Sequence, residues 1–344
     1  MSNAANSLAA PKKRKPTNIF KSENPHQPEK PKRNKRSERR KATENGIKAL
    51  NPNWGYAFVA PFFVMFLIFG LAPVIYSIWI AFYNWDPLGD EQQFYGFTNF
   101  TDLIVDENFW IALRNTFSIW FFSTLPQMIM AIGLASILRN PRLKGATFWR
   151  TILLVPNITS VLAIAIVFGQ LFGRDFGLVN LALTYLGMPS HIDWIAEPLP
   201  SHIAIATMIT WRWLGYNSLI FLASMLAIPA YLYESADLDG ASKWQQFRYI
   251  TLPQLRNTIT FVLIVGTIGG LQVFAEPLTL GGNFSGGDSR QFSTLTLFLY
   301  EQAFVNNRWG YAAAIGIFIT IIVIIISAIN FAITRRISSE DNDK

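Results

Sequence analysis

Residues 309–334 read WGYAAAIGIFITIIVIIISAINFAIT, a run of 26 residues without a charged side chain. A helix crosses the hydrocarbon layer of a membrane with about 20 predominantly apolar residues, so this run is long enough to be a membrane span. Another run, His202–Tyr233, is interrupted only by Arg212. Four further runs contain no charged residue and are long enough, or nearly long enough, to cross a membrane: Ala49–Trp85, Asn115–Leu138, Thr151–Gly173 and Asn257–Ala275.

These runs predict an all-α polytopic membrane protein with six transmembrane helices. We place the helices near Tyr56–Tyr83, Asn115–Leu138, Thr151–Phe172, His202–Leu226, Thr258–Phe274 and Tyr311–Ile333. Charged residues make up 15% of the 344 residues, against roughly 25% in soluble domains. The absence of cysteine excludes a disulfide scaffold, a Cys-ligated metal and a thiol nucleophile. The chain has only three histidines, which argues against a His-rich metal site, so we expect no bound metal.

The charges of the connecting segments predict the orientation in the membrane, because Lys and Arg accumulate in cytoplasmic loops. The loop after the second predicted span is basic and has no acid; it holds Arg139, Arg142, Lys144 and Arg150. The same side would hold both ends of the chain and the loop at about 228–256. The loops of the opposite side hold 4 basic and 12 acidic residues. Both the N and the C terminus are therefore predicted to be cytoplasmic.

Three regions follow from the charge distribution. Residues 1–50 hold 14 Lys and Arg against 4 Asp and Glu, and they lack apolar periodicity. We predict a disordered basic cytoplasmic tail that lies against anionic lipid. Pro11–Lys15 (PKKRK) is also typical of nucleic-acid or nuclear-import patches, but we expect no nucleic-acid partner. Residues 51–336 form the six-span domain, and residues 337–344 form a short cytoplasmic tail.

The loop after the fourth predicted span is unusually long. Residues 233–253 read YESADLDGASKWQQFRYITLP. Pro229 opens a short helix, Gly240 interrupts it, a second amphipathic turn follows, and Pro253 is expected to end that turn. The first helix carries acids in a compartment that is otherwise basic: Glu234, Asp237 and Asp239. This composition favours a protein partner over lipid.

The same loop resembles the "EAA" motif of the permease subunits of binding-protein-dependent ABC importers. The matching positions are Glu234, Ala236, Asp239, Gly240, Ala241, Phe247, Ile250, Leu252 and Pro253. Ser235 departs from the motif by a small-for-small change. The resemblance extends over about Tyr56–Arg336 and is strongest to the sugar-importing branch, whose maltose and glycerol-phosphate members pair as heterodimers. It implies a type I ABC importer permease fold.

The resemblance also implies partners and a membrane. A second permease subunit, two cytoplasmic ATPase subunits and an external solute-binding protein are expected, in the cell (inner) membrane of a bacterium or archaeon. Glu234 and Asp239 would pair with basic groups of the ATPase, and Gly240 would allow a sharp turn. The coupling positions carried over are Glu234, Ala236, Asp239, Gly240, Ala241, Phe247 and Pro253. The chain has no Gly-x4-Gly-Lys-Ser/Thr loop, so we expect no enzyme activity, no cofactor of its own, and ATP-Mg on the ATPase.

The cargo path is expected on the fourth and fifth spans, where the maltose-type permeases place their substrate contacts. Polar and aromatic side chains suit a sugar, which presents hydroxyls at its edges and C–H groups on its faces. The candidates are Trp213, Gly215, Tyr216, Asn217, Gln272 and Phe274. Arg212 is the one ionisable residue inside a predicted span. We expect it to form a structural ion pair, with Glu276 as the candidate partner, and not to contact the substrate.

The sequence also raises three alternative functions. The same architecture importing glycerol phosphate or another small polar solute stays open, because Arg212 could face an anion. An intramembrane serine hydrolase using Ser285 and His202 is disfavoured, since no acid is placed to orient the histidine. We read the glycine-rich segment around Ser285 instead as a mobile external loop that touches the binding protein. A standalone carrier would leave the long motif-bearing loop unexplained.

Overall fold

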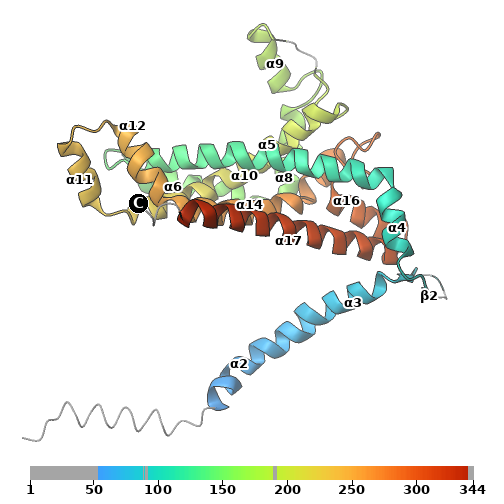
Figure 1. Ribbon diagram of the computed structural model, residues 1–344. Helices are drawn as coiled ribbons and strands as arrows, with labels where there is room; N and C mark the ends of the chain where they lie inside the picture. The colour runs from blue at the N-terminus through green and yellow to red at the C-terminus, as the bar shows by residue number, and fades with distance from the viewer. Residues whose placement is uncertain (1–52, 88, 90–91, 189–191, 340–344) are drawn as a thin grey trace, which may run out of the picture. The chain divides into compact units, whose positions relative to one another are not determined.

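The computed structural model of the chain describes residues 53–87, 89, 92–188 and 192–339, and these residues are almost wholly helical (Figure 1). The predicted basic tail, residues 1–50, lies outside the described residues, as do residues 340–344 of the predicted C-terminal tail. The chain divides into two compact units, Met1–Phe66 and Leu67–Lys344.

The described part of the first unit is helix α2 (Asn53–Met65), which continues into a π-helical turn, η1 (Phe66–Leu71). The sequence of α2 has no charged residue, and none of its described side chains is buried. Phe62 stacks on Phe66 with ring centroids 6.4 Å apart. An apolar helix with every described side chain exposed is suited to a lipid environment rather than to water.

The second unit holds all the remaining described elements, and its helices and loops carry the candidate site residues. They are α3 (Ala72–Ile80), β1 (Tyr83–Asn84), β2 (Gln93–Phe94), α4 (Thr98–Val105), α5 (Glu107–Leu138), α6 (Ala146–Ile152), α7 (Val155–Ile158), α8 (Val161–Leu171), α9 (Leu178–Tyr185), α10 (Pro198–Leu226), α11 (Ala230–Leu238), α12 (Lys243–Gln246), η2 (Phe247–Thr251), α13 (Leu252–Gln254), α14 (Arg256–Leu271), α15 (Ala275–Gly281), α16 (Leu295–Tyr300), η3 (Glu301–Val305) and α17 (Trp309–Ser339). The strands β1 and β2 form a two-residue antiparallel hairpin with Tyr83 opposite Phe94. The predicted all-α class therefore holds apart from this hairpin.

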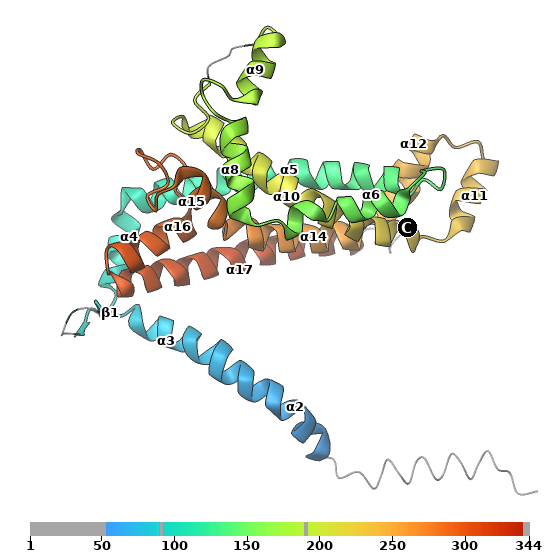
Figure 2. The ribbon, with the colours of Figure 1, turned by 180° about the vertical axis from the view of Figure 1, so that it is seen from behind.

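The long helices α5, α10, α14 and α17 run along one another in the second unit (Figures 1 and 2). Helix α10 packs most extensively on α5, and α14 contacts both α5 and α17. Ala131 and Ala135 of α5 are fully buried in a core cluster with Phe221 and Met225 of α10 and Val262 of α14. Small residues on α5 let the helix axes approach closely, which is the usual way that membrane helices pack.

Three helices are long and apolar enough to cross a membrane: Gly55–Ile80, Glu107–Leu138 and Trp309–Ala332. Three pairs of helices meet the same test when each pair is taken together, although each is bent at a short break: Ala146–Ile158 with Val161–Leu171, Pro198–Leu226 with Ala230–Leu238, and Arg256–Leu271 with Ala275–Gly281. The described residues thus contain three to six candidate spans. The predicted number of six stays a prediction, as does the cytoplasmic position of the termini.

The third predicted span, Thr151–Phe172, is not one straight helix. The chain bends by 94° between α7 and α8. Thr159 and Ser160 are extended at this break, with ψ angles of 144° and 131°. The prediction missed the bend because summed hydropathy does not record the direction of the chain. Pro253 was also wrongly expected to end a helical turn, since it lies in the first turn of α13, where its missing N–H is tolerated.

Candidate functional site: a cavity between helices and an exposed loop

A cavity of about 410 Å³ lies between α5, α10, α14 and the segment that joins α14 to α15. Five of the six residues predicted for the cargo path line this cavity: Trp213, Tyr216, Asn217, Gln272 and Phe274. Apolar side chains of α10 and α14 complete the wall, among them Ile209, Ile220, Phe261 and Val265. The lining thus combines aromatic faces with amide groups, which is the usual composition of a small-molecule site.

Helix geometry explains why these residues meet. The cavity-lining positions of α10 are 209, 212, 213, 216, 217 and 220, a spacing of three and four that puts them on one helix face. Helix α14 ends at Leu271, and α15 continues at an angle of 43°. This bend places the short segment from Gln272 to Glu276 at the cavity wall. On α14 itself, Gly266 and Gly269 line the cavity and have no side chain to fill it.

Arg212 and Glu276 form an ion pair at the wall of the cavity. A guanidinium nitrogen of Arg212 lies 2.9 Å from Glu276 Oε1, and the exposed fractions of the two side chains are 22% and 8%. The guanidinium also lies 5.7 Å from the centre of the Trp213 ring. Among the described residues that line the cavity, these two are the only charged ones. Their opposite charges make the lining neutral as a whole, and each charge satisfies the other away from bulk water.

Gly215, the sixth predicted path residue, is not among the residues that line the cavity. It faces the chain between α6 and α7, where an added Cβ would lie 1.8 Å from the carbonyl oxygen of Leu153. Residue 215 needs to be glycine because the backbone of α10 and the backbone at Leu153 approach each other closely here. The structure therefore gives Gly215 a packing position rather than a place on the cavity wall.

Sequence reasoning missed the contribution of α5 to the cavity. Ser123, Thr124 and Gln127 line it, and Asn217 Nδ2 donates a hydrogen bond of 3.3 Å to Gln127 Oε1. The available signal was the spacing of these polar residues, which puts them on one face of an otherwise apolar span. The sequence alone does not say that this face meets α10.

The loop with the EAA-like motif begins with a helix that ends in a defined turn. Gly240 follows the end of α11 with a φ of +75°, a conformation that glycine adopts without a Cβ penalty. The N–H of Ala241 donates to the carbonyl of Ala236 at 2.9 Å, and the N–H of Gly240 donates to the carbonyl of Asp237 at 3.2 Å. These two bonds form a Schellman motif. The Asp-Gly-Ala part of the sequence motif is thus a helix-ending device.

Side-chain contacts hold the two halves of the loop together. Lys243 Nζ lies 2.7 Å from a carboxylate oxygen of Asp237, and the buried Gln246 donates to the same oxygen. The hydrogen bond from Lys243 and then that from Gln246 lower the pKa of Asp237, because both favour the ionised carboxylate. Ser242 and Gln245 form a capping box that starts α12.

The outer surface of the loop presents acids beside large apolar side chains. Glu234 and Asp239 are exposed, and so is Pro253. Leu238 is 90% exposed and Trp244 is 70% exposed; the Trp244 ring stacks on Phe247 at 5.6 Å. Other exposed aromatic residues nearby are Tyr231 and Tyr249. A mixed apolar and acidic surface of this kind is typical of a protein interaction site.

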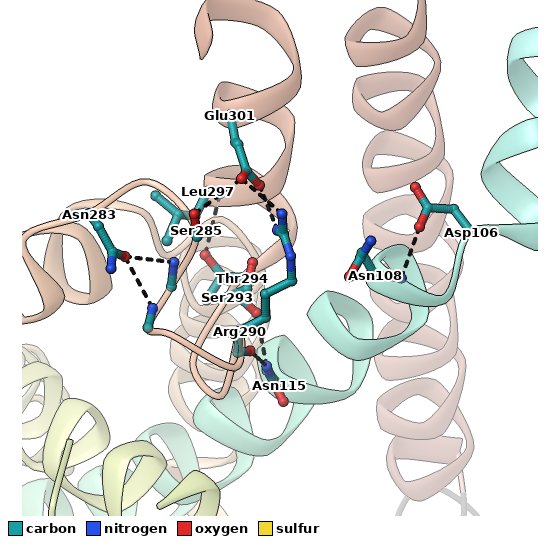
Figure 3. Close-up of polar contacts among 12 residues, drawn as sticks. Asp106, Asn108, Asn115, Asn283, Ser285, Arg290, Ser293, Thr294, Leu297 and Glu301 are labelled. Atoms are coloured by element: carbon teal, nitrogen blue, oxygen red, sulfur yellow. Dashed lines mark hydrogen bonds and ion pairs between the residues drawn. The ribbon is translucent and has the colours of Figure 1, made fainter. Parts of the chain in front are cut away.

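The opposite end of the second unit carries a polar network around the segment that follows α15 (Figures 1 and 3). The Arg290 guanidinium binds the Glu301 carboxylate through two bonds of 2.6 and 2.9 Å, and Ser285 Oγ donates to the same carboxylate at 3.2 Å. Asn115 Nδ2 donates to the carbonyls of Arg290 and Ser293. The segment expected to be a mobile loop is therefore tied to α5 and η3 by several bonds.

The same network bears on the hydrolase alternative. The two ring nitrogens of His202 hydrogen-bond Ser118 Oγ and the carbonyl of Gln291, each at 2.8 Å. Ser285 bonds to Glu301 instead, so the serine and the histidine do not form a nucleophile and base pair. Within the described residues, no three His, Asp or Glu side chains gather as metal ligands.

The fold and the cavity define a helical membrane permease, and comparisons with known proteins agree. A family model described as "Binding-protein-dependent transport system inner membrane component" matches residues 108–339. The lactose transport system permease protein LacF of Rhizobium radiobacter is 35% identical over 287 residues, which are 82% of this chain and 94% of that protein. The arabinooligosaccharides transport system permease protein AraP of Bacillus subtilis is 34% identical, over 83% of this chain and 90% of that protein.

A solved structure shows the same fold. A chain of a bacterial ABC transporter involved in the import of the acidic polysaccharide alginate superposes with a TM-score of 0.71 and 27% sequence identity, over 85% of this chain and 99% of that chain. The present chain therefore belongs to the family of binding-protein-dependent transport system inner membrane components. It is a multi-pass membrane protein and a transport permease, as the resemblance of its loop had implied.

Proposed function

We propose that this chain forms one half of the translocation path of an ATP-driven importer for an uncharged sugar or oligosaccharide. The observation that carries the proposal is the cavity, which combines aromatic faces with amide and hydroxyl groups and whose only charged residues, among those described, are paired. Sugars stack their C–H faces on aromatic rings and bond their hydroxyls to amides. The relatives that transport lactose and arabinooligosaccharides support the same class of cargo.

The pairing of Arg212 separates a neutral cargo from an anionic one. A phosphate or a carboxylate in the cavity would need a cation that is not already neutralised. The guanidinium of Arg212 is bound to Glu276 at 2.9 Å, and a second anion at this place would be repelled by the Glu276 carboxylate. The solved relative imports an acidic polysaccharide, so the shared fold does not set the charge of the cargo. We therefore place glycerol phosphate, the alternative, second.

The exposed loop supports the remaining part of the proposal, which concerns energy coupling. Glu234 and Asp239 lie exposed beside Leu238 on a loop with a fixed shape, and we assign this surface to an ATPase subunit that carries basic groups. Two such subunits would hydrolyse ATP-Mg on their own sites and move the loops of this chain and of a second permease. An external solute-binding protein would deliver the sugar at the opposite end. The membrane would be the inner, or cell, membrane of a prokaryote.

Competition for uptake tests the proposal. Cells that carry the complete transporter are given radiolabelled lactose, maltose or trehalose, with and without an excess of unlabelled glycerol 3-phosphate. We expect ATP-dependent uptake of at least one neutral sugar and no inhibition by glycerol 3-phosphate. Radiolabelled glycerol 3-phosphate is offered in a parallel assay, and its uptake in place of every sugar offered would contradict the assignment of a neutral cargo.

A further inference from the structure

Gln127 of α5 carries an unpartnered hydrogen-bond donor at the cavity. The side chain is 6% exposed and lies among the cavity-lining residues. Its Oε1 accepts a hydrogen bond from Asn217 Nδ2 at 3.3 Å, whereas its Nε2 is buried and has no partner among the described residues. Buried polar groups almost always have a hydrogen-bond partner, so a donor without one at the wall of a binding cavity calls for an explanation.

The contact with Asn217 orients the donor. Asn217 uses an N–H of its amide for Gln127, which leaves its carbonyl oxygen as an acceptor on the same cavity wall. In this pair the NH2 group of Gln127 and the second N–H of Asn217 remain as donors, and the carbonyl oxygen of Asn217 remains as an acceptor. Turning both amides by 180° exchanges the two roles and leaves the same pair of functions. Two neighbouring hydroxyl groups match this pair, because one hydroxyl accepts while the other donates.

We propose that Gln127 determines specificity by donating to one hydroxyl of a vicinal diol, with Asn217 accepting from the next hydroxyl. This inference rests on the proposed function, because it assumes that the cargo in the cavity is a sugar. It adds the helix α5, which the sequence had not pointed to, to the cargo-binding wall. A cargo that lacks one of the two hydroxyls leaves one amide group unpaired, and such unpaired groups account for strong discrimination between similar substrates.

The chain offers a matched control. Gln302 of η3 is also 6% exposed and also has an amide atom without a partner, its Oε1, but it is not among the cavity-lining residues. Substituting Gln302→Met therefore removes a comparable buried amide away from the proposed site. The test variant is Gln127→Met, which keeps about the length of the side chain and adds no charge. It removes both the N–H donor and the acceptor for Asn217.

The experiment compares uptake of a sugar with uptake of its monodeoxy analogues. The complete transporter is reconstituted in vesicles with its own binding protein, and the probe is whichever of lactose, maltose or trehalose the wild type imports fastest. Since all variants use the same binding protein, a change in the ratio of the two uptake rates reports on the permease. We expect the wild type to prefer the parent sugar over one analogue by about three- to tenfold, the worth of one hydrogen bond.

Gln127→Met is expected to lose this preference, while Gln302→Met keeps it. The ratio compares two substrates of one protein sample, so a variant that assembles poorly changes both rates and not their quotient. If Gln127→Met keeps the wild-type ratio for every deoxy analogue, the role of Gln127 is wrong and the proposed function stands. If the wild type imports none of the sugars, the proposed function fails, and this inference fails with it.

Discussion

Removing the charge of Arg212 alone should destabilise the protein far more than removing both charges of its ion pair. The variant Arg212→Met leaves the Glu276 carboxylate, 8% exposed, without its cation. Breaking a buried pair by removing one partner costs about 3–5 kcal/mol, because an uncompensated charge stays buried. Arg212 is 22% exposed and borders the cavity, so water reaches the site in part. We therefore expect a loss near the lower end, about 3 kcal/mol of unfolding free energy.

The double variant Arg212→Met with Glu276→Gln removes both charges and should recover most of that loss. A coupling energy of at least about 2 kcal/mol is expected between the two sites, within the range measured for residues in contact. The assay is unfolding of the purified protein in mixed detergent, followed by tryptophan fluorescence. The exposed pair Arg174 and Asp193, at 3.5 Å and with Arg174 64% exposed, is the control; its coupling should stay below about 1 kcal/mol. Additive losses in the Arg212 and Glu276 variants would show that the pair is not coupled, and our account of the neutral cavity would be wrong.

Three further predictions concern the loop and the packing. Glu234→Lys reverses an exposed charge on the surface assigned to the ATPase. It should abolish ATP-dependent uptake while the amount of protein in the membrane is unchanged. Normal uptake would show that Glu234 is not part of the docking surface. Gly215→Val puts a Cβ 1.8 Å from the carbonyl oxygen of Leu153, so the folded yield measured by gel filtration should fall severalfold. Gly187→Ala is the control, because nothing lies within 4 Å of an added Cβ there. It should cost no more than about 2 kcal/mol of stability, the cost of an alanine at a positive φ. Because the pKa of Asp237 is lowered in the folded protein, the stabilising contact with Lys243 is fully present above the ordinary pKa of aspartate, about 3.9. The contact is lost as the pH falls through the lower pKa of the folded protein. An NMR titration should show that Lys243→Met raises the pKa of Asp237, and an unchanged pKa would contradict the assigned cause.

The sequence predicted the parts of the fold that depend on composition along the chain. Charge-free runs located helices that the structure contains, such as Glu107–Leu138 and Trp309–Ser339. The loop helices were also predictable, because Gly240 and Ser242 are residues with strong local preferences for a helix end and a helix start. Local chemistry decides these features, so no knowledge of the tertiary structure is needed.

Features that depend on contacts between distant residues were harder to predict. The bend before α8 redirects the chain without changing its hydropathy. Gly215 and Asn217 are two residues apart, yet one packs on Leu153 and the other faces the cavity, because positions two apart on a helix point to different faces. Gln127 lies 90 residues from its partner Asn217, and only the packing of α5 on α10 brings them together.

Purification of this chain with its natural partners decides whether it works as a subunit of an ATP-driven importer. The tagged chain is extracted from its native membrane in mild detergent, and the chains that copurify are identified by mass spectrometry. We predict a second multi-pass permease chain and an ATPase, and we predict that Glu234→Lys loses the ATPase but keeps the second permease. A wild-type chain that purifies alone, or only with copies of itself, would contradict the account.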